Sequence, residues 1–230
     1  MTDLAGREQV EILADKDPGV GLPGRVYLPG YSRTMGPQSH LFAERERLQS
    51  LTWEYFDVKQ LSPTIGAELV GLDLSQELTD EVVSEIQQAL WDYKVIFFRN
   101  QEITSEEQLR FAQRFGELEI HPFLPPNTET PELVRFEKNA NAAGYENQWH
   151  HDVTWRETPS QGAILRAIEI PPIGGDTLFV DANAAYEGLT QERKDEIDSL
   201  NAVHDFLRAF GRQVPKEKLA EMREMYPLVK

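Results

Sequence analysis

The segment 149–189 decides the interpretation of this chain and reads WHHDVTWRETPSQGAILRAIEIPPIGGDTLFVDANAAYEGL. It begins with His150 and Asp152 and later contains the run Gly174-Gly175-Asp176-Thr177. In an extended strand, side chains at positions i and i+2 point to the same face, so an imidazole and a carboxylate there can hold one ion. Both belong to the two-histidine, one-carboxylate ligand set that suits non-haem Fe(II). The segment therefore indicates a candidate metal site with one ligand still to be found.

The spacing of His150 and Asp152 also has a simpler interpretation. A histidine and an aspartate two positions apart on a strand can form an ordinary hydrogen-bonded pair, and short motifs often match by chance. His151 lies between them and would point to the opposite face of such a strand, so we expect it to be structural. The residues around the pair are needed to choose between the two interpretations.

Those surrounding residues resemble a known enzyme family. The segment 149–189 is similar to the core of the taurine dioxygenase (TauD/TfdA) family of Fe(II)- and 2-oxoglutarate-dependent dioxygenases. The likeness includes Phe115-Gly116-Glu117-Leu118, His121-Pro122 and the run from His204-Asp205-Phe206 to Phe210. It covers about residues 53–230, and several motifs occur in the family's order. The resemblance implies an oxidoreductase of the 2-oxoglutarate-dependent dioxygenase class.

The resemblance implies a role for five residues through their places in the motifs. His150 and Asp152 are expected to ligate Fe(II), and Thr177 to donate a hydrogen bond to a carboxylate of 2-oxoglutarate. His121 is expected to face the substrate, and Phe210 matches an aromatic residue near the substrate. Residue type alone would equally allow a loop histidine at 121, a β-branched core residue at 177 and a core phenylalanine at 210.

The implied reaction uses 2-oxoglutarate and O₂ as co-substrates and releases succinate and CO₂ while the substrate is hydroxylated. The expected substrate is a small organic acid, such as a sulfonate, a sulfate ester or a related compound. Taurine is disfavoured, because Glu146 stands where taurine-specific members carry Asn, and Leu124 stands where they carry Tyr. Two alternatives remain open: a non-catalytic relative that retains the fold and a partial metal site, and a cupin-like metal hydrolase or isomerase.

Composition limits the class of protein. The chain has 230 residues, enough for one domain with a sizeable core. Its net charge of -16 disfavours a nucleic-acid or anionic-membrane surface, which would need Lys and Arg. The absence of cysteine excludes disulfides and thiolate metal sites. With no apolar leader or membrane-spanning run visible, we expect a cytoplasmic protein that forms a homo-oligomer.

The pattern along the chain predicts an extended or partly disordered arm over residues 1–50 and a globular domain over 51–230. Apolar periodicity predicts both strands and helices in this domain. The predicted strands cover 53–60, 64–72, 95–98, 162–170 and 177–180, and the predicted helices cover 79–93, 104–115, 184–189, 191–200 and 216–225. The pattern alone gives a mixed α and β class. The resemblance implies a double-stranded β-helix, the jelly roll of the cupins, with helices packed outside it.

The resemblance also implies that the domain 51–230 is incomplete at its C-terminal side. Family members supply a second histidine ligand, and an Arg that holds the distal carboxylate of 2-oxoglutarate, from much further beyond the His-x-Asp motif than this chain extends. His204 is the sole histidine that follows the motif, and the family places it in a structural position. We therefore expect the third iron ligand, this Arg and the C-terminal strands to be absent from the sequence.

Overall fold

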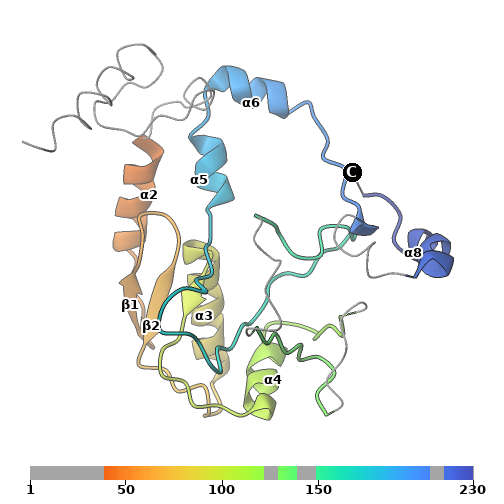
Figure 1. Cartoon of the computed structure of the whole chain (residues 1–230). Helices are drawn as coiled ribbons and strands as arrows, with labels where there is room; N and C mark the ends of the chain where they lie inside the picture. The colour runs from red at the N-terminus through yellow and green to blue at the C-terminus, as the bar shows by residue number, and fades with distance from the viewer. Residues whose placement is uncertain (1–38, 122–128, 139–148, 208–214, 230) are drawn as a thin grey trace, which may run out of the picture. The chain divides into compact units, whose positions relative to one another are not determined.

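The computed structural model describes residues 39–121, 129–138, 149–207 and 215–229, and Figure 1 labels its elements. The chain divides into two compact units. Unit 1 comprises Met1–Leu72, Thr79–Asn100 and Thr177–Leu200, and unit 2 comprises Asp73–Leu78, Gln101–Asp176 and Asn201–Lys230. The candidate metal pair lies in unit 2, whereas Thr177 begins the last segment of unit 1.

Unit 1 contains a small mixed sheet with the order β1-β2-β3. β1 (Asp57–Gln60) pairs antiparallel with β2 (Ala67–Val70), and β2 pairs parallel with β3 (Ile96–Phe97). In β2 the side chains of Ala67 and Leu69 are buried, as expected for alternate positions facing the core. The strands predicted over 53–60, 64–72 and 95–98 are confirmed in position, and each is shorter than predicted.

Helix α3 (Asp80–Tyr93) begins and ends where the sequence predicts. The hydroxyl of Thr79 accepts a hydrogen bond from the backbone N–H of Val82, which satisfies one of the free donors of the first turn. The helix ends at Lys94, whose φ of 66° lies in the left-handed region. Its apolar stripe is buried and consists of Val83, Ile86, Ala89 and Tyr93. This stripe supplies half of the buried apolar side chains described in unit 1.

Helix α2 (Ser39–Gln49, orange in Figure 1) corrects the expectation of an extended arm in this part of the chain. Leu48 is fully buried, and the hydroxyl of Tyr93 donates a hydrogen bond to its carbonyl oxygen over 3.2 Å. Polar contacts also join α2 to the end of α3. Arg47 lies 2.7 Å from Asp92, and Lys94 lies 3.2 Å from Glu44. Residues 1–38 of the expected arm lie outside the described residues.

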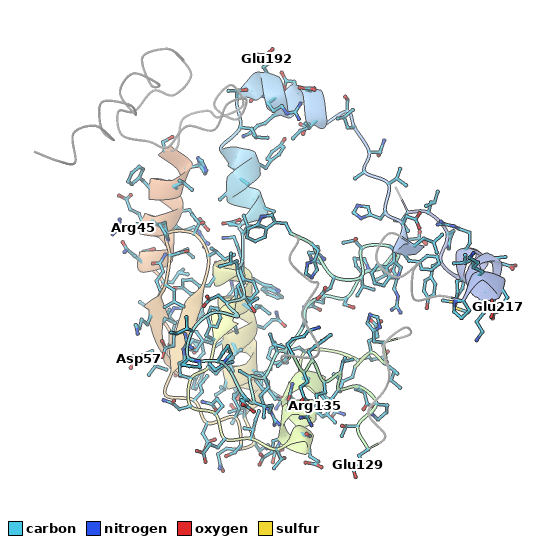
Figure 2. All side chains as sticks on the ribbon, in the orientation of Figure 1. Arg45, Asp57, Glu129, Arg135, Glu192 and Glu217 are labelled. Atoms are coloured by element: carbon cyan, nitrogen blue, oxygen red, sulfur yellow. The ribbon has the colours of Figure 1, made fainter. Side chains whose placement is uncertain are left out.

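Two short helices complete unit 1, as the sequence predicts. Helix α5 (Ala182–Glu187) begins after Asp181, whose carboxylate accepts from the N–H of Ala184 over 3.0 Å. Helix α6 (Gln191–Ile197) begins after Thr190, whose hydroxyl accepts from the N–H of Arg193. The α6 residue Glu192, labelled in Figure 2, is exposed to solvent.

Unit 2 contains the remaining described helices. Helix α4 (Ser105–Gln113) starts with the expected capping box, in which Thr104 and Glu107 each bind the other's backbone N–H. The C-terminal helix predicted over 216–225 is present as a short 3₁₀ turn, η2 (Lys216–Lys218), followed by α8 (Leu219–Met225). None of the described helices is long and apolar enough to cross a bilayer.

The strands predicted over 162–170 and 177–180 are wrong for this structure, because both segments have irregular backbone. A strand needs a neighbouring strand to pair its backbone N–H and C=O groups, and no described segment pairs with either of these. Their apolar side chains are exposed: Ile164, Leu165, Ile168, Ile170, Leu178, Phe179 and Val180. The described residues therefore form a mixed α and β structure with one three-stranded sheet, which confirms the coarser prediction.

Replacing Glu44 with Gln tests the docking of α2. We expect a loss of about 1 kcal/mol in the free energy of unfolding at neutral pH, because solvent partly screens the ion pairs of Glu44. Hydrogen bonding to Arg47, opposed by burial and aided by Lys94, lowers the pKa of Glu44 from 4.5 to about 2. A lowered carboxyl pKa stabilises the fold fully above the unfolded value, and that effect disappears as pH falls through the folded value.

The difference between wild type and Glu44→Gln should therefore shrink as pH falls from 4.5 towards 2, measured by urea unfolding at several pH values. Glu46→Gln is the matched control, because Glu46 is an exposed carboxylate on the same helix. A constant difference across this pH range, or an equal effect in the control, would contradict the docking role of Glu44.

Candidate functional site

His150 and Asp152 lie together in unit 2, as the sequence predicts. The Nε2 atom of His150 is 3.3 Å from Oδ1 of Asp152, and both side chains are more than half exposed. The expected strand geometry is wrong, because the backbone at Asp152 enters a turn that continues to Trp155. Val153 has a φ of 56°, and the N–H of Arg156 donates to the carbonyl oxygen of Val153 over 3.2 Å. The two side chains therefore lie together immediately before a turn, and not along a strand.

His151 has a different environment, in keeping with the structural role expected for it. Its Nδ1 atom lies 3.0 Å from the carbonyl oxygen of Asp152. A carbonyl oxygen can only accept, so Nδ1 carries the proton in this contact. The ring of His151 therefore binds the backbone of the turn.

A hydrophobic cluster holds the turn in place. Val153 and Trp155 are buried, with 6% and 8% of their surfaces exposed, and they pack with Phe206, which is fully buried. Leu207, Met222 and Tyr226 cover this cluster from the side. A β-branched residue at positive φ costs on the order of 1–3 kcal/mol, so surrounding contacts must favour this conformation strongly. Burial of Val153 and Trp155 supplies those contacts.

His121 lies against the same turn. Its ring meets the indole of Trp155 edge to face, with the ring centroids 6.5 Å apart. Burial lowers the pKa of His121 below 6.5, Glu119 and Asp152 act in the opposite direction, and Arg156 adds to the lowering. Burial therefore favours the neutral form of the imidazole. The structure thus brings together three of the five predicted site residues, namely His121, His150 and Asp152.

Of the remaining two predicted site residues, the structure describes Thr177 alone. Thr177 is exposed in unit 1 and follows Gly174 and Gly175, whose φ values of 78° and 75° favour glycine at both positions. A Cβ atom on Gly175 would also lie 3.2 Å from Cγ of Pro171, closer than most real contacts. Phe210 lies outside the described residues, as do Leu124 and Glu146.

Sequence reasoning missed an ion pair beside the site. Nη2 of Arg156 lies 2.8 Å from Oε1 of Glu119, and the Ser160 hydroxyl donates to the other carboxylate oxygen of Glu119 over 2.8 Å. The guanidinium of Arg156 also lies over the ring of Tyr226, 5.9 Å from its centroid. Glu119 precedes His121 by two positions, and Arg156 follows Asp152 by four. The sequence did show opposite charges close to two predicted site residues, Glu119 near His121 and Arg156 near Asp152. Their spacing in the sequence alone does not predict that the two charges form an ion pair.

The atoms of His150 and Asp152 fit two positions of a metal site. Metal–ligand bonds to imidazole and carboxylate are about 2.1 Å, so two neighbouring donor atoms around an octahedral ion lie about 3 Å apart. The observed separation of 3.3 Å is close to this value. No group of three or more His, Asp or Glu side chains converges within the described parts of the chain. The pair therefore supplies part of a ligand set.

Comparison with known proteins identifies the family. Residues 57–230 match the family described as "Taurine catabolism dioxygenase TauD, TfdA family". The chain belongs to the TauD/TfdA family. This confirms the resemblance seen in the sequence, and the matched range includes every predicted site residue of this family member.

Two relatives match this TauD/TfdA protein over part of their own length. An "Alkylsulfatase" of Acinetobacter baylyi is 34% identical over 177 residues, which are 75% of this chain and 55% of that protein. An "Alpha-ketoglutarate-dependent sulfate ester dioxygenase" of Pseudomonas putida is 39% identical over 150 residues, 64% of this chain and 49% of that protein. The chain spans about half the length of these relatives.

Solved structures are also similar to this chain. A taurine dioxygenase from Burkholderia xenovorans superposes with a TM-score of 0.58 and 37% identity, covering 66% of this chain and 54% of that one. The structure of AAD-2 in complex with Mn(II) and N-oxalylglycine gives a TM-score of 0.55 and 30% identity, covering 76% and 62%. About two thirds to three quarters of the chain therefore shares its fold with these solved structures.

Substituting Phe206 with Ala tests whether the hydrophobic cluster holds the turn. We expect a loss of about 3–5 kcal/mol in the free energy of unfolding, because a fully buried aromatic side chain leaves a cavity. Phe42→Ala, at an exposed position, should change it by less than about 0.5 kcal/mol. Urea unfolding of both variants measures the difference. Equal, small effects would show that the cluster does not support the turn.

Proposed function

We propose that this protein is an Fe(II)- and 2-oxoglutarate-dependent dioxygenase that hydroxylates a small organic acid and releases succinate and CO₂. The observation that carries the proposal is the 3.3 Å approach of His150 and Asp152 within the segment that matches the family. Relatives named as alpha-ketoglutarate-dependent dioxygenases support the co-substrate, since alpha-ketoglutarate is 2-oxoglutarate. A solved relative that holds Mn(II) supports the metal.

The residues divide the work as follows in this proposal. His150 and Asp152 hold Fe(II) at two of its positions, and Thr177 donates its hydroxyl hydrogen to a carboxylate of 2-oxoglutarate. His121 faces the substrate, and Phe210 lines the substrate site. When bound, the iron supplies the redox chemistry that activates O₂, while the protein provides ligand geometry and orientation.

The environment of His121 defines what this residue does. Burial lowers the pKa of its imidazole and so favours the neutral ring, which can donate one hydrogen bond and accept another without adding charge. Its edge-to-face contact with Trp155 fixes the orientation of the ring. Trp155, which is buried together with Val153, places an apolar surface against this ring. His121 thus orients a substrate by hydrogen bonding beside an apolar surface.

The proposed substrate is a sulfate ester or a sulfonate other than taurine. Two relatives are named for sulfate chemistry, the alkylsulfatase and the sulfate ester dioxygenase. A third, from Saccharomyces cerevisiae, is an "Alpha-ketoglutarate-dependent sulfonate dioxygenase" with 27% identity over 213 residues. Glu146 and Leu124 replace the residues of taurine-specific members, which favours a substrate without the taurine amine. The names of these relatives favour the dioxygenase over a metal hydrolase or a non-catalytic relative.

The proposal includes the fold. We infer a double-stranded β-helix with helices packed outside it. The likeness to solved dioxygenases supports this inference, as does the apolar character of the exposed segments 162–170 and 177–180. Exposed apolar runs of this kind are rarely left uncovered in soluble proteins.

Three single substitutions test the metal pair. We expect His150→Ala and Asp152→Ala to weaken Fe(II) binding more than about 100-fold, because losing a ligand exceeds the 10–100-fold effect of losing a surrounding hydrogen bond. His151→Ala should bind Fe(II) nearly as well as wild type, since its ring contacts backbone. Anaerobic calorimetric titration measures all three. Loss of binding in His151→Ala together with retention in His150→Ala would reject the assignment.

The substitution Thr177→Val tests the 2-oxoglutarate contact. Removing one donor to a charged acceptor should cost on the order of 1.5–3 kcal/mol, or about 10- to 150-fold in 2-oxoglutarate affinity. Thr177→Ser keeps the hydroxyl and should keep most of the affinity. Titration of 2-oxoglutarate into the Fe(II) protein under anaerobic conditions compares them. Equal affinities of the Val and Ser variants would show that the hydroxyl makes no such contact.

A further inference from the structure

The ion pair between Glu119 and Arg156 connects the two segments that carry the proposed site residues. Glu119 belongs to the segment that leads to His121, and Arg156 closes the turn that follows Asp152. Arg156 contributes twice, through its backbone N–H to Val153 and through its guanidinium to Glu119. Arg156 therefore closes the turn through its backbone and links the turn to the His121 segment through its side chain.

The pair has two supporting contacts and is partly shielded from water. About 28% of the Arg156 side chain and 32% of the Glu119 side chain are exposed. Ser160 donates to Glu119, and the ring of Tyr226 lies under the guanidinium. Partial burial reduces screening, so the attraction between the charges exceeds that of a surface pair. A planar guanidinium over an aromatic ring also has few orientations available.

We propose that the Glu119–Arg156 ion pair is a positioning element, which holds the ring of His121 against Trp155 and so fixes its place relative to the Asp152 turn. The hydrophobic cluster holds the turn through Val153 and Trp155. The ion pair holds the segment of His121. Any effect of this ion pair on metal and substrate binding rests on the function proposed above. The placement of the His121 ring by the ion pair does not depend on that function.

The chain offers a matched control in the same unit. Arg223 binds Asp205 through two contacts of 2.9 and 3.0 Å, and its guanidinium lies over the ring of Phe206, 5.5 Å from the centroid. This pair has similar exposure and also stacks on an aromatic ring, but neither partner lies in the His121 segment or in the turn. Because Phe206 packs in the same cluster, Asp205→Asn also reveals any general loosening.

Nuclear Overhauser contacts between the rings of His121 and Trp155, measured on the metal-free protein, test the positioning directly. We expect Glu119→Gln and Arg156→Gln to lose most of this contact, while Arg156→Lys, which keeps the charge, retains part of it. Asp205→Asn should keep it in full. If Arg156→Gln does not fold, Ser160→Ala removes one hydrogen bond to Glu119 and should weaken the contact. Unchanged contacts in Glu119→Gln, or equal loss in Asp205→Asn, would overturn the proposal.

Calorimetric titration of the same proteins with Mn(II) tests whether the ion pair also supports metal binding. Glu119→Gln and Arg156→Gln should bind Mn(II) about tenfold more weakly than Asp205→Asn, as expected when a group supporting a metal site is removed. Equal affinities in all three would contradict the consequence for the metal site. A wild-type protein that binds no Mn(II) would reject the proposed function, and the ring contact would still decide the positioning.

Discussion

The turn at Val153 is the constraint on which the site depends. A β-branched residue at positive φ is unfavourable by itself, and here it is held because Val153 and Trp155 are buried against Phe206. This conformation directly follows Asp152, whose carboxylate lies 3.3 Å from the imidazole of His150. The same turn presents Trp155 to His121 and Arg156 to Glu119. Relaxing it would disturb the contacts of Trp155 and Arg156 together.

Unit 1 also contains a residue with positive φ that is held by contacts to other segments, namely Lys94. This residue ends α3. Its ammonium lies 2.8 Å from the carbonyl oxygen of Thr64, 3.2 Å from Glu44 and 3.4 Å from Asp181. One side chain thereby joins α2, the turn before β2 and the start of α5. In each unit, a backbone conformation that is costly locally is kept by contacts to several separate segments.

Local signals predicted much of this structure, and long-range pairing was the main source of error. The helix at α3 was predictable from Thr79 and its apolar stripe, and α4 from the capping box of Thr104 and Glu107. Helix α2 was missed because it lacks a clear apolar stripe and depends on contacts to α3. The segments 162–170 and 177–180 have strand-like composition, but strand formation depends on a partner that composition does not specify. His150 and Asp152 were predicted correctly as neighbours, from a strand geometry that proved wrong.

The central claim is that the pair His150 and Asp152 forms part of a site where Fe(II) and 2-oxoglutarate bind together. Anaerobic addition of 2-oxoglutarate to the Fe(II) protein, followed by visible absorption, tests it most directly. The account predicts a metal-to-ligand charge-transfer band that grows with 2-oxoglutarate to saturation and does not form when Zn(II), which has no redox chemistry, replaces Fe(II). Fe(II) binding without such a band at saturating 2-oxoglutarate would contradict the account.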